Sequence, residues 1–156
     1  MNYLYLALGL LAGMVLPVQA SINNRLGTMF GKEPLFASFI SFFVGALVLG
    51  VLVLLRIDNQ VISQGFGNMT LADSWKWVGG AMGAFFVFTS IFLSPKIGVA
   101  NMMFLFILGQ LAMAMLIDSF GLIGMPVQSV HWTKIVGLIA MVGSVAFFIM
   151  GKKWFE

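Results

Sequence analysis

The first apolar stretch of the chain contains polar residues whose types and spacing suit the binding of a small molecule. Gln19 and Asn23 are four residues apart, so they lie on one face of a helix. Pro17 removes one backbone hydrogen bond just before them and should kink or loosen the helix there. If this stretch crosses a membrane, the freed carbonyl group needs a protein partner or a water-filled cavity. The pattern therefore favours a polar cavity lined by Gln19 and Asn23.

Polar side chains also interrupt later apolar stretches. Ser90 and Gln110 are further candidates for a substrate cavity, and Asp118 is the only carboxylate within the predicted helices. The alternative role for each amide is an interhelical hydrogen bond that supports packing alone. Asp118 lies about one turn from the end of a stretch, where solvation at the helix end competes with a role in ion coupling.

The sequence shows no pattern of an enzyme active site or a metal centre. It has no cysteine and a single histidine, His131, in a loop beside Trp132. It also lacks a phosphate-binding glycine loop and a zinc-binding pair of histidines. We therefore predict that the protein is not an enzyme and has no catalytic residues, no metal and no cofactor.

The composition is that of a membrane protein. Hydrophobic residues make up 61% of the chain and charged residues 8%, whereas about 25% of the residues of a soluble domain are charged. The few basic residues stand between apolar runs, which is typical of anchoring at the membrane edge rather than of nucleic-acid binding. The expected partner is the lipid bilayer.

A helical span needs about 20 mostly apolar residues. The chain contains five such stretches, at about residues 3–26, 35–55, 75–93, 97–120 and 134–150. We expect residues 56–74 to form the longest polar connection and Ser94-Pro95-Lys96 to end the third span. The predicted fold is an all-α membrane protein whose residues 1–156 form a single transmembrane domain.

A secretory signal peptide is the alternative for the first stretch. Residues 3–16 would supply its apolar core, and Val18 and Ala20 resemble a cleavage site. A signal peptide also needs a positively charged segment at its start, and no lysine or arginine precedes Arg25. We therefore interpret this stretch as a membrane span.

Small residues recur on single faces of the predicted helices. Gly9 and Gly13 share a face of the first, and Gly79 and Gly83 share a face of the third. Such residues let helix backbones approach closely in a membrane. We expect these four glycines to serve helix packing.

Five spans place the two ends of the chain on opposite sides of the membrane. Basic residues fall on both sides, with Arg25, Lys32, Lys96, Lys152 and Lys153 against Arg56, Lys76 and Lys134. The positive-inside rule then favours a cytoplasmic C-terminus by a small margin. A chain with so little bias can insert in both orientations.

Three segments resemble one known family. The pattern Gly13-x-x-x-Pro17-x-Gln19-x-x-x-Asn23 resembles the first-helix signature of the YdcZ-type proteins, half-size, five-span members of the drug/metabolite transporter superfamily. Residues 79–101 are similar to the third helix and turn of that family. Residues 109–126, with Gln110 and Asp118 in matching places, are similar to its fourth helix.

The resemblance implies a multi-pass protein of the bacterial inner membrane that acts as a secondary transporter of an unidentified small molecule. Full-length relatives have ten spans in two inverted five-span repeats, with the substrate bound at the midplane between them. This chain would form half of such a transporter. An antiparallel homodimer, or a pair with an oppositely oriented paralogue, would complete it.

The sequence is also compatible with two other functions. One is a small dual-topology channel lined by the polar residues, and the other is a non-transporting assembly partner of another membrane protein. The small multidrug relatives use a glutamate within the first helix, and this first helix has none. This departure places proton-coupled export of cations by that route in doubt.

Overall fold

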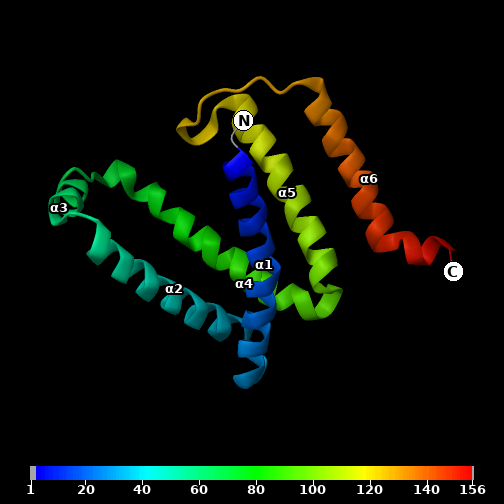
Figure 1. Ribbon diagram of the computed structural model, residues 1–156, viewed down its shortest axis with the longest axis horizontal. Helices are drawn as coiled ribbons and strands as arrows, with labels where there is room; N and C mark the ends of the chain where they lie inside the picture. The colour runs from blue at the N-terminus through cyan, green and yellow to red at the C-terminus, as the bar shows by residue number, and fades with distance from the viewer. Residues whose placement is uncertain (1–2, 156) are drawn as a thin grey trace. The chain divides into compact units, whose positions relative to one another are not determined.

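The computed structural model describes residues 3–155, and side chains for residues 3–151, as helices joined by short connections (Figure 1). The α-helices are α1 (Tyr3–Met29), α2 (Pro34–Arg56), α3 (Asn59–Gly67), α4 (Val78–Ile97), α5 (Val99–Phe120) and α6 (Trp132–Phe155). Two 3₁₀ helices, η1 (Leu71–Trp77) and η2 (Leu122–Gly124), precede α4 and follow α5.

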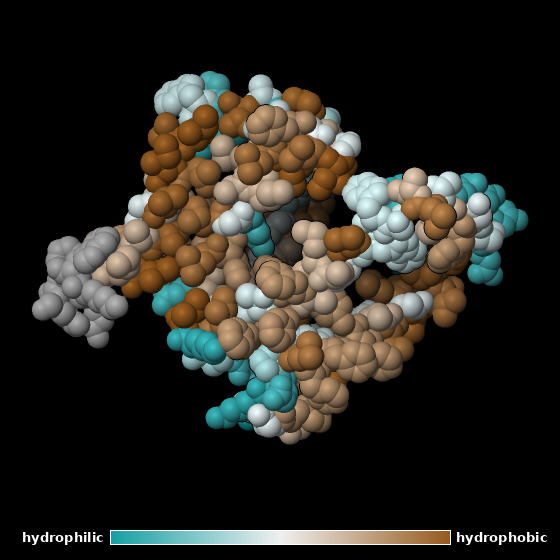
Figure 2. Space-filling view, turned by 180° about the vertical axis from the view of Figure 1, so that it is seen from behind, coloured by the Kyte–Doolittle hydropathy of each residue, from teal (hydrophilic) through white to brown (hydrophobic). Residues whose placement is uncertain are grey.

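Five segments are long and apolar enough to cross a membrane: Tyr3–Met29, Pro34–Arg56, Leu71–Ile97, Val99–Phe120 and Trp132–Gly151. They confirm the prediction of an all-helical chain with five candidate spans. The surface seen in Figure 2 is mostly hydrophobic, with hydrophilic residues confined to small patches. A surface of this kind suits contact with lipid, whereas in water it would favour aggregation.

The connection at residues 56–74 is not a simple loop, because it contains α3 and most of η1. Asp58 caps α3 by accepting a hydrogen bond from the backbone nitrogen of Gln60 at 3.0 Å. At η1, the Thr70 backbone nitrogen donates to the Asp73 carboxylate at 3.0 Å, and Lys76 forms an ion pair with Asp73 at 2.6 Å. These caps satisfy backbone groups that a short helix leaves unpaired.

The third membrane-spanning helix does not end at Ser94-Pro95-Lys96 as expected. Helix α4 continues through Pro95 to Ile97. A proline inside a helix removes a single hydrogen bond, which a helix packed on its neighbours can tolerate. Gly98 ends α4 instead, because its φ of +84° is a conformation that favours glycine.

The chain divides into two compact units, one ending at Lys96 and the other beginning at Ile97. In the first unit, Ala37, Val87 and Ile91 form a small buried core, with Leu26 and Phe86 packed against it. This core joins α1, α2 and α4. In the second unit, α5 packs on α6, and the rings of Phe104 and Phe148 lie with their centroids 4.3 Å apart.

Candidate substrate-binding site

Helix α1 buries one narrow face within the first unit. Its buried residues are Ala20, Asn23 and Gly27, which follow one another at helical spacing. Gln19 is half-buried and lies one turn before Asn23. Helix α1 is continuous through Pro17, whose missing N–H leaves the carbonyl group of Gly13 without its usual donor.

Gly27 lets the beginning of α2 and the middle of α4 approach α1. A Cβ atom at Gly27 would lie 3.5 Å from the Cβ of Ala37 and 3.9 Å from the Cγ2 of Ile91. Both distances are ordinary van der Waals contact, so the space for a methyl group exists and the space for a larger side chain does not. Gly27 therefore sets how closely α1 can pack on its two neighbours.

The side of α4 that faces the interior carries two serines. Ser90 and Ser94 are 4% and 5% exposed, next to buried Val87 and Ile91. The Asn24 side-chain amide nitrogen donates a hydrogen bond to the Ser94 hydroxyl oxygen at 3.0 Å, which links α1 to α4. The Ser90 hydroxyl donates to the Val87 carbonyl oxygen at 2.7 Å, and its oxygen can still accept from a ligand.

Asn23 is buried, at 5% exposure, and the nitrogen of its side-chain amide lacks a hydrogen-bond acceptor within the described chain. Among the residues that the structure describes, none accepts a hydrogen bond from its Nδ2 atom. An unsatisfied buried donor of this kind costs about 1–3 kcal/mol, so such groups are rare and call for an explanation. A polar ligand or a water molecule beside Asn23 would supply the missing acceptor.

We call the polar residues on these two faces the α1–α4 polar cluster: Gln19, Asn23, Asn24, Ser90 and Ser94. The sequence predicted Gln19, Asn23 and Ser90 as cavity residues and did not single out Asn24 or Ser94 for binding. The signal for Asn24 was its place beside Asn23 in an otherwise apolar helix. The signal for Ser94 was its spacing of four residues from Ser90, which places the two serines on one face of the helix.

The other two predicted polar residues, Gln110 and Asp118, lie in the second unit. Gln110 is exposed on α5. Asp118 is half-buried and lines a cavity of about 360 Å³ between α5 and α6, together with Lys134. No ion pair joins Asp118 to Lys134 among the described residues. Among the residues that the structure describes, no group of three or more acidic or histidine side chains could hold a metal ion.

The predicted packing glycines have different surroundings. A Cβ at Gly83 would lie 3.4 Å from the ring of Phe42, so this glycine sits against α2. A Cβ at Gly9, Gly13 or Gly79 would meet nothing within 4 Å among the described residues. The surroundings of these three glycines therefore do not show the close helix packing that the sequence predicted for them.

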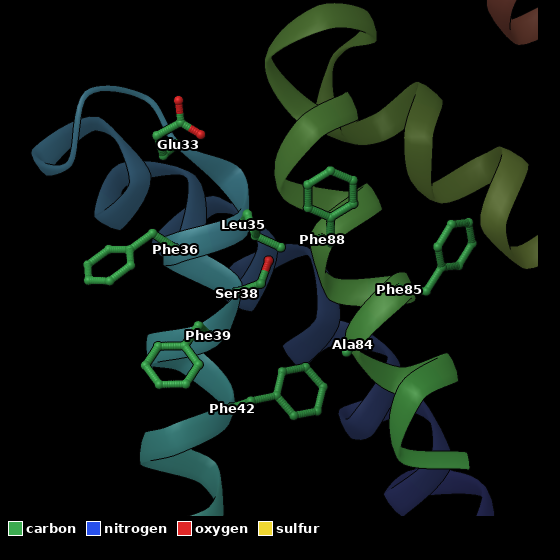
Figure 3. A pocket seen from close by; sticks show the side chains of 9 residues that line it. All are labelled: Glu33, Leu35, Phe36, Ser38, Phe39, Phe42, Ala84, Phe85 and Phe88. Atoms are coloured by element: carbon green, nitrogen blue, oxygen red, sulfur yellow. The ribbon is translucent and has the colours of Figure 1, made fainter. Parts of the chain in front are cut away.

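Two hollows lie within the first unit, and one of them shares a residue with the polar cluster. An open groove of about 820 Å³ runs between α2 and α4, and the side chains that line it are mostly aromatic (Figure 3). A second hollow of about 390 Å³ lies where α1 ends, and it is lined by Asn24, Thr28, Lys32 and Lys96 among others. Asn24 belongs to both the polar cluster and this second hollow.

Comparison with known proteins identifies the family. Residues 4–147 match the family described as "Putative inner membrane exporter, YdcZ". The chain is 29% identical over 143 residues to the inner membrane protein YdcZ of Escherichia coli strain K12, an alignment that covers 90% of this chain and 92% of that protein. No solved structure matches the chain. The chain belongs to the YdcZ family and is a multi-pass protein of the inner membrane.

Proposed function

We propose that the protein is a secondary transporter that exports a small molecule, and that its substrate binds at the α1–α4 polar cluster. The buried Asn23 amide without an acceptor carries the proposal. A group of this kind is expensive to keep in an apolar interior unless a ligand or water uses it. Family membership supports export, since the family is described as an exporter.

The geometry of the cluster suits recognition of a polar ligand. Asn23 offers two donors and one acceptor oxygen, and Gln19 one turn away offers the same set. The Asn24–Ser94 hydrogen bond links α1 to α4 close to these two amides in the chain. A ligand with both a carbonyl or hydroxyl group and a donor would satisfy the cluster, and it would release bound water on entering.

We further propose that two copies in opposite orientations form the working transporter. Between 6% and 22% of the residues in the most apolar part of each span are buried, so one chain offers little interior of its own. The open positions at Gly9, Gly13 and Gly79 would accept helices of a second copy. The nearly even distribution of lysine and arginine supports insertion in both orientations.

A thermal-shift screen with metabolites and drugs on the purified protein tests the binding site. We expect at least one compound to stabilise the wild type, and we expect Asn23→Leu and Gln19→Leu to fold but lose that stabilisation. Asn101→Leu is the matched control, because the Asn101 amide already donates to the carbonyl oxygen of Ile97, four residues earlier in the chain, at 2.7 Å. Full ligand response in Asn23→Leu would rule out the cluster as the binding site.

Flux measurements in proteoliposomes then distinguish a carrier from a channel. With a stabilising compound as substrate, a carrier shows saturable uptake and counterflow of labelled substrate against unlabelled substrate. Steady conductance under an applied voltage, without counterflow, would identify a channel and contradict the proposed mechanism.

A further inference from the structure

The end of the first unit where α1 joins α2 carries two lysines that line the same hollow. Lys32 lies in the connection and Lys96 in the last turn of α4, and both border the hollow of about 390 Å³. The Lys96 ammonium nitrogen lies 3.5 Å from the centroid of the Phe92 ring. Among the described residues, neither lysine forms an ion pair with a carboxylate. The hollow therefore presents two positive charges that no carboxylate among the described residues pairs with.

The backbone holds Lys32 in an unusual conformation at this place. Its φ is +66°, a region that residues other than glycine seldom adopt, and Gly31 before it has φ +68°. The backbone nitrogen of Lys32 donates to the Gly27 carbonyl oxygen at 2.9 Å, which closes the end of α1. This closure keeps Lys32 beside the end of α4 and does not leave it on a free loop.

The aromatic groove between α2 and α4 leads toward the same end. Its walls carry Phe36, Phe39 and Phe42 from α2 and Phe85 and Phe88 from α4 (Figure 3). The Phe88 ring is stacked on the Phe92 ring with their centroids 6.0 Å apart. Phe92 in turn lines the lysine hollow. The apolar groove and the hollow with the two lysines therefore adjoin at the stacked rings of Phe88 and Phe92.

We infer that this groove and hollow form a binding site for a membrane phospholipid, with an acyl chain along the phenylalanines and the phosphate between Lys32 and Lys96. Basic pockets between membrane helices bind anionic lipid headgroups. The adjoining groove is apolar, as an acyl chain is. Glu33 lines the groove at the same end and is the single acidic residue among the side chains that border the two hollows (Figure 3). Two lysines and one glutamate leave a net charge of +1, which matches a phosphodiester.

Binding of phosphatidylglycerol to the purified full-length chain in uncharged detergent tests the site. The melting temperature is recorded against lipid concentration. We expect phosphatidylglycerol to stabilise the wild type, and Lys32→Gln and Lys96→Gln each to raise the half-maximal concentration about fivefold. Lys32→Arg and Lys96→Arg should bind as the wild type does, because they keep the charge. Lys76→Gln is the control, since Lys76 is paired with Asp73 in η1.

A second arm separates a lipid from a soluble anion. Glycerol phosphate carries the headgroup charge without an acyl chain, so we expect it to give no stabilisation at the same concentrations. Native mass spectrometry of the wild type should also detect one retained phosphatidylglycerol, which does not depend on variants that fold. Equal stabilisation by glycerol phosphate would overturn the lipid assignment. An equal loss in Lys76→Gln would show unspecific attraction to the protein and would also overturn it.

Discussion

The Asn24 side-chain amide donates a 3.0 Å hydrogen bond to the hydroxyl of Ser94, and this bond joins the end of α1 to the last turn of α4. It joins the side chains of two membrane-spanning helices, from residues that lie 70 positions apart in the chain. Asn23 lies beside Asn24 in the chain, and Ser90 lies one turn before Ser94. The bond therefore fixes the part of the α1–α4 contact where the proposed substrate would bind.

Removing this bond should cost a modest amount of stability. In a double-mutant cycle of Asn24→Ala and Ser94→Ala, we expect a coupling energy of about 0.6 kcal/mol, the average for such bonds in a membrane, and at most about 1.7 kcal/mol. Unfolding of the purified protein in a denaturing detergent series measures it. Ser144→Ala is a suitable control, because that hydroxyl donates within its own helix to the Ala140 carbonyl oxygen at 2.9 Å. A coupling energy of zero would mean that the two side chains act independently.

Substitutions at Gly27 should depend steeply on size. Gly27→Ala should be nearly neutral, because its Cβ would lie 3.5 Å or more from its neighbours. Gly27→Leu should destabilise the protein by about 1–3 kcal/mol by overpacking against Ala37 and Ile91. Gly13→Leu lies in open space and should leave the fold of one chain intact. Melting temperatures of the three variants test this order. A melting temperature of Gly27→Leu equal to that of the wild type would contradict it.

Gly121 and Gly124 allow the effect of a turn contact to be separated from that of backbone conformation. Both have positive φ, at +60° and +75°. A Cβ at Gly121 would lie 2.7 Å from the Cγ2 of Val127 and 3.1 Å from the carbonyl oxygen of Met125, whereas a Cβ at Gly124 would meet nothing within 4 Å. Each alanine substitution should cost about 1 kcal/mol for the backbone, and Gly121→Ala should cost more. If Gly124→Ala lowers the stability at least as much as Gly121→Ala does, the contacts of Gly121 with Met125 and Val127 do not contribute to stability.

The sequence predicted the five spans well because each is set by a long apolar run that only a helix can carry through lipid. It failed where a short local interaction decides the structure. The caps at Asp58 and Thr70 build α3 and η1 in a segment that is polar on average. Packing of α4 on α1 and α2 keeps the helix intact through Pro95, and no pattern of single residues reports such packing.

The candidate site was predictable in part for the same reason. Gln19 and Asn23 stand out because amides are rare in apolar helices. Their helical spacing also places them on one face. The contribution of Asn24 depends on its contact with a residue 70 positions later in the chain, which spacing cannot reveal. The sequence alone likewise could not show that Lys32 and Lys96 share one hollow.

Orientation in the membrane should respond to very few charges. We expect Lys152 and Lys153 to hold most of the preference for a cytoplasmic C-terminus, because the two sides are predicted to carry similar numbers of basic residues. A C-terminal reporter on the wild type should show both orientations, and replacing both lysines by glutamine should increase the population with the C-terminus outside. Two lysines inserted near Asn59 should act in the same direction. A reporter found only in the cytoplasm, unmoved by either change, would exclude an antiparallel homodimer.

The most direct measurement for the proposed site uses the absence of cysteine from the chain. Asn23→Cys and Ser90→Cys place single thiols in the α1–α4 polar cluster, and Ile22→Cys places one beside it at a position that is 62% exposed in the isolated chain and would face lipid. Each variant is treated in proteoliposomes with a small, water-soluble methanethiosulfonate, which reacts only with thiols that water reaches. A cluster that forms a transport cavity predicts rapid labelling of Asn23→Cys and Ser90→Cys, protection by a stabilising compound, and slow labelling of Ile22→Cys. Unreactive thiols at both cluster positions would show a dry packing interface and would contradict the proposed site.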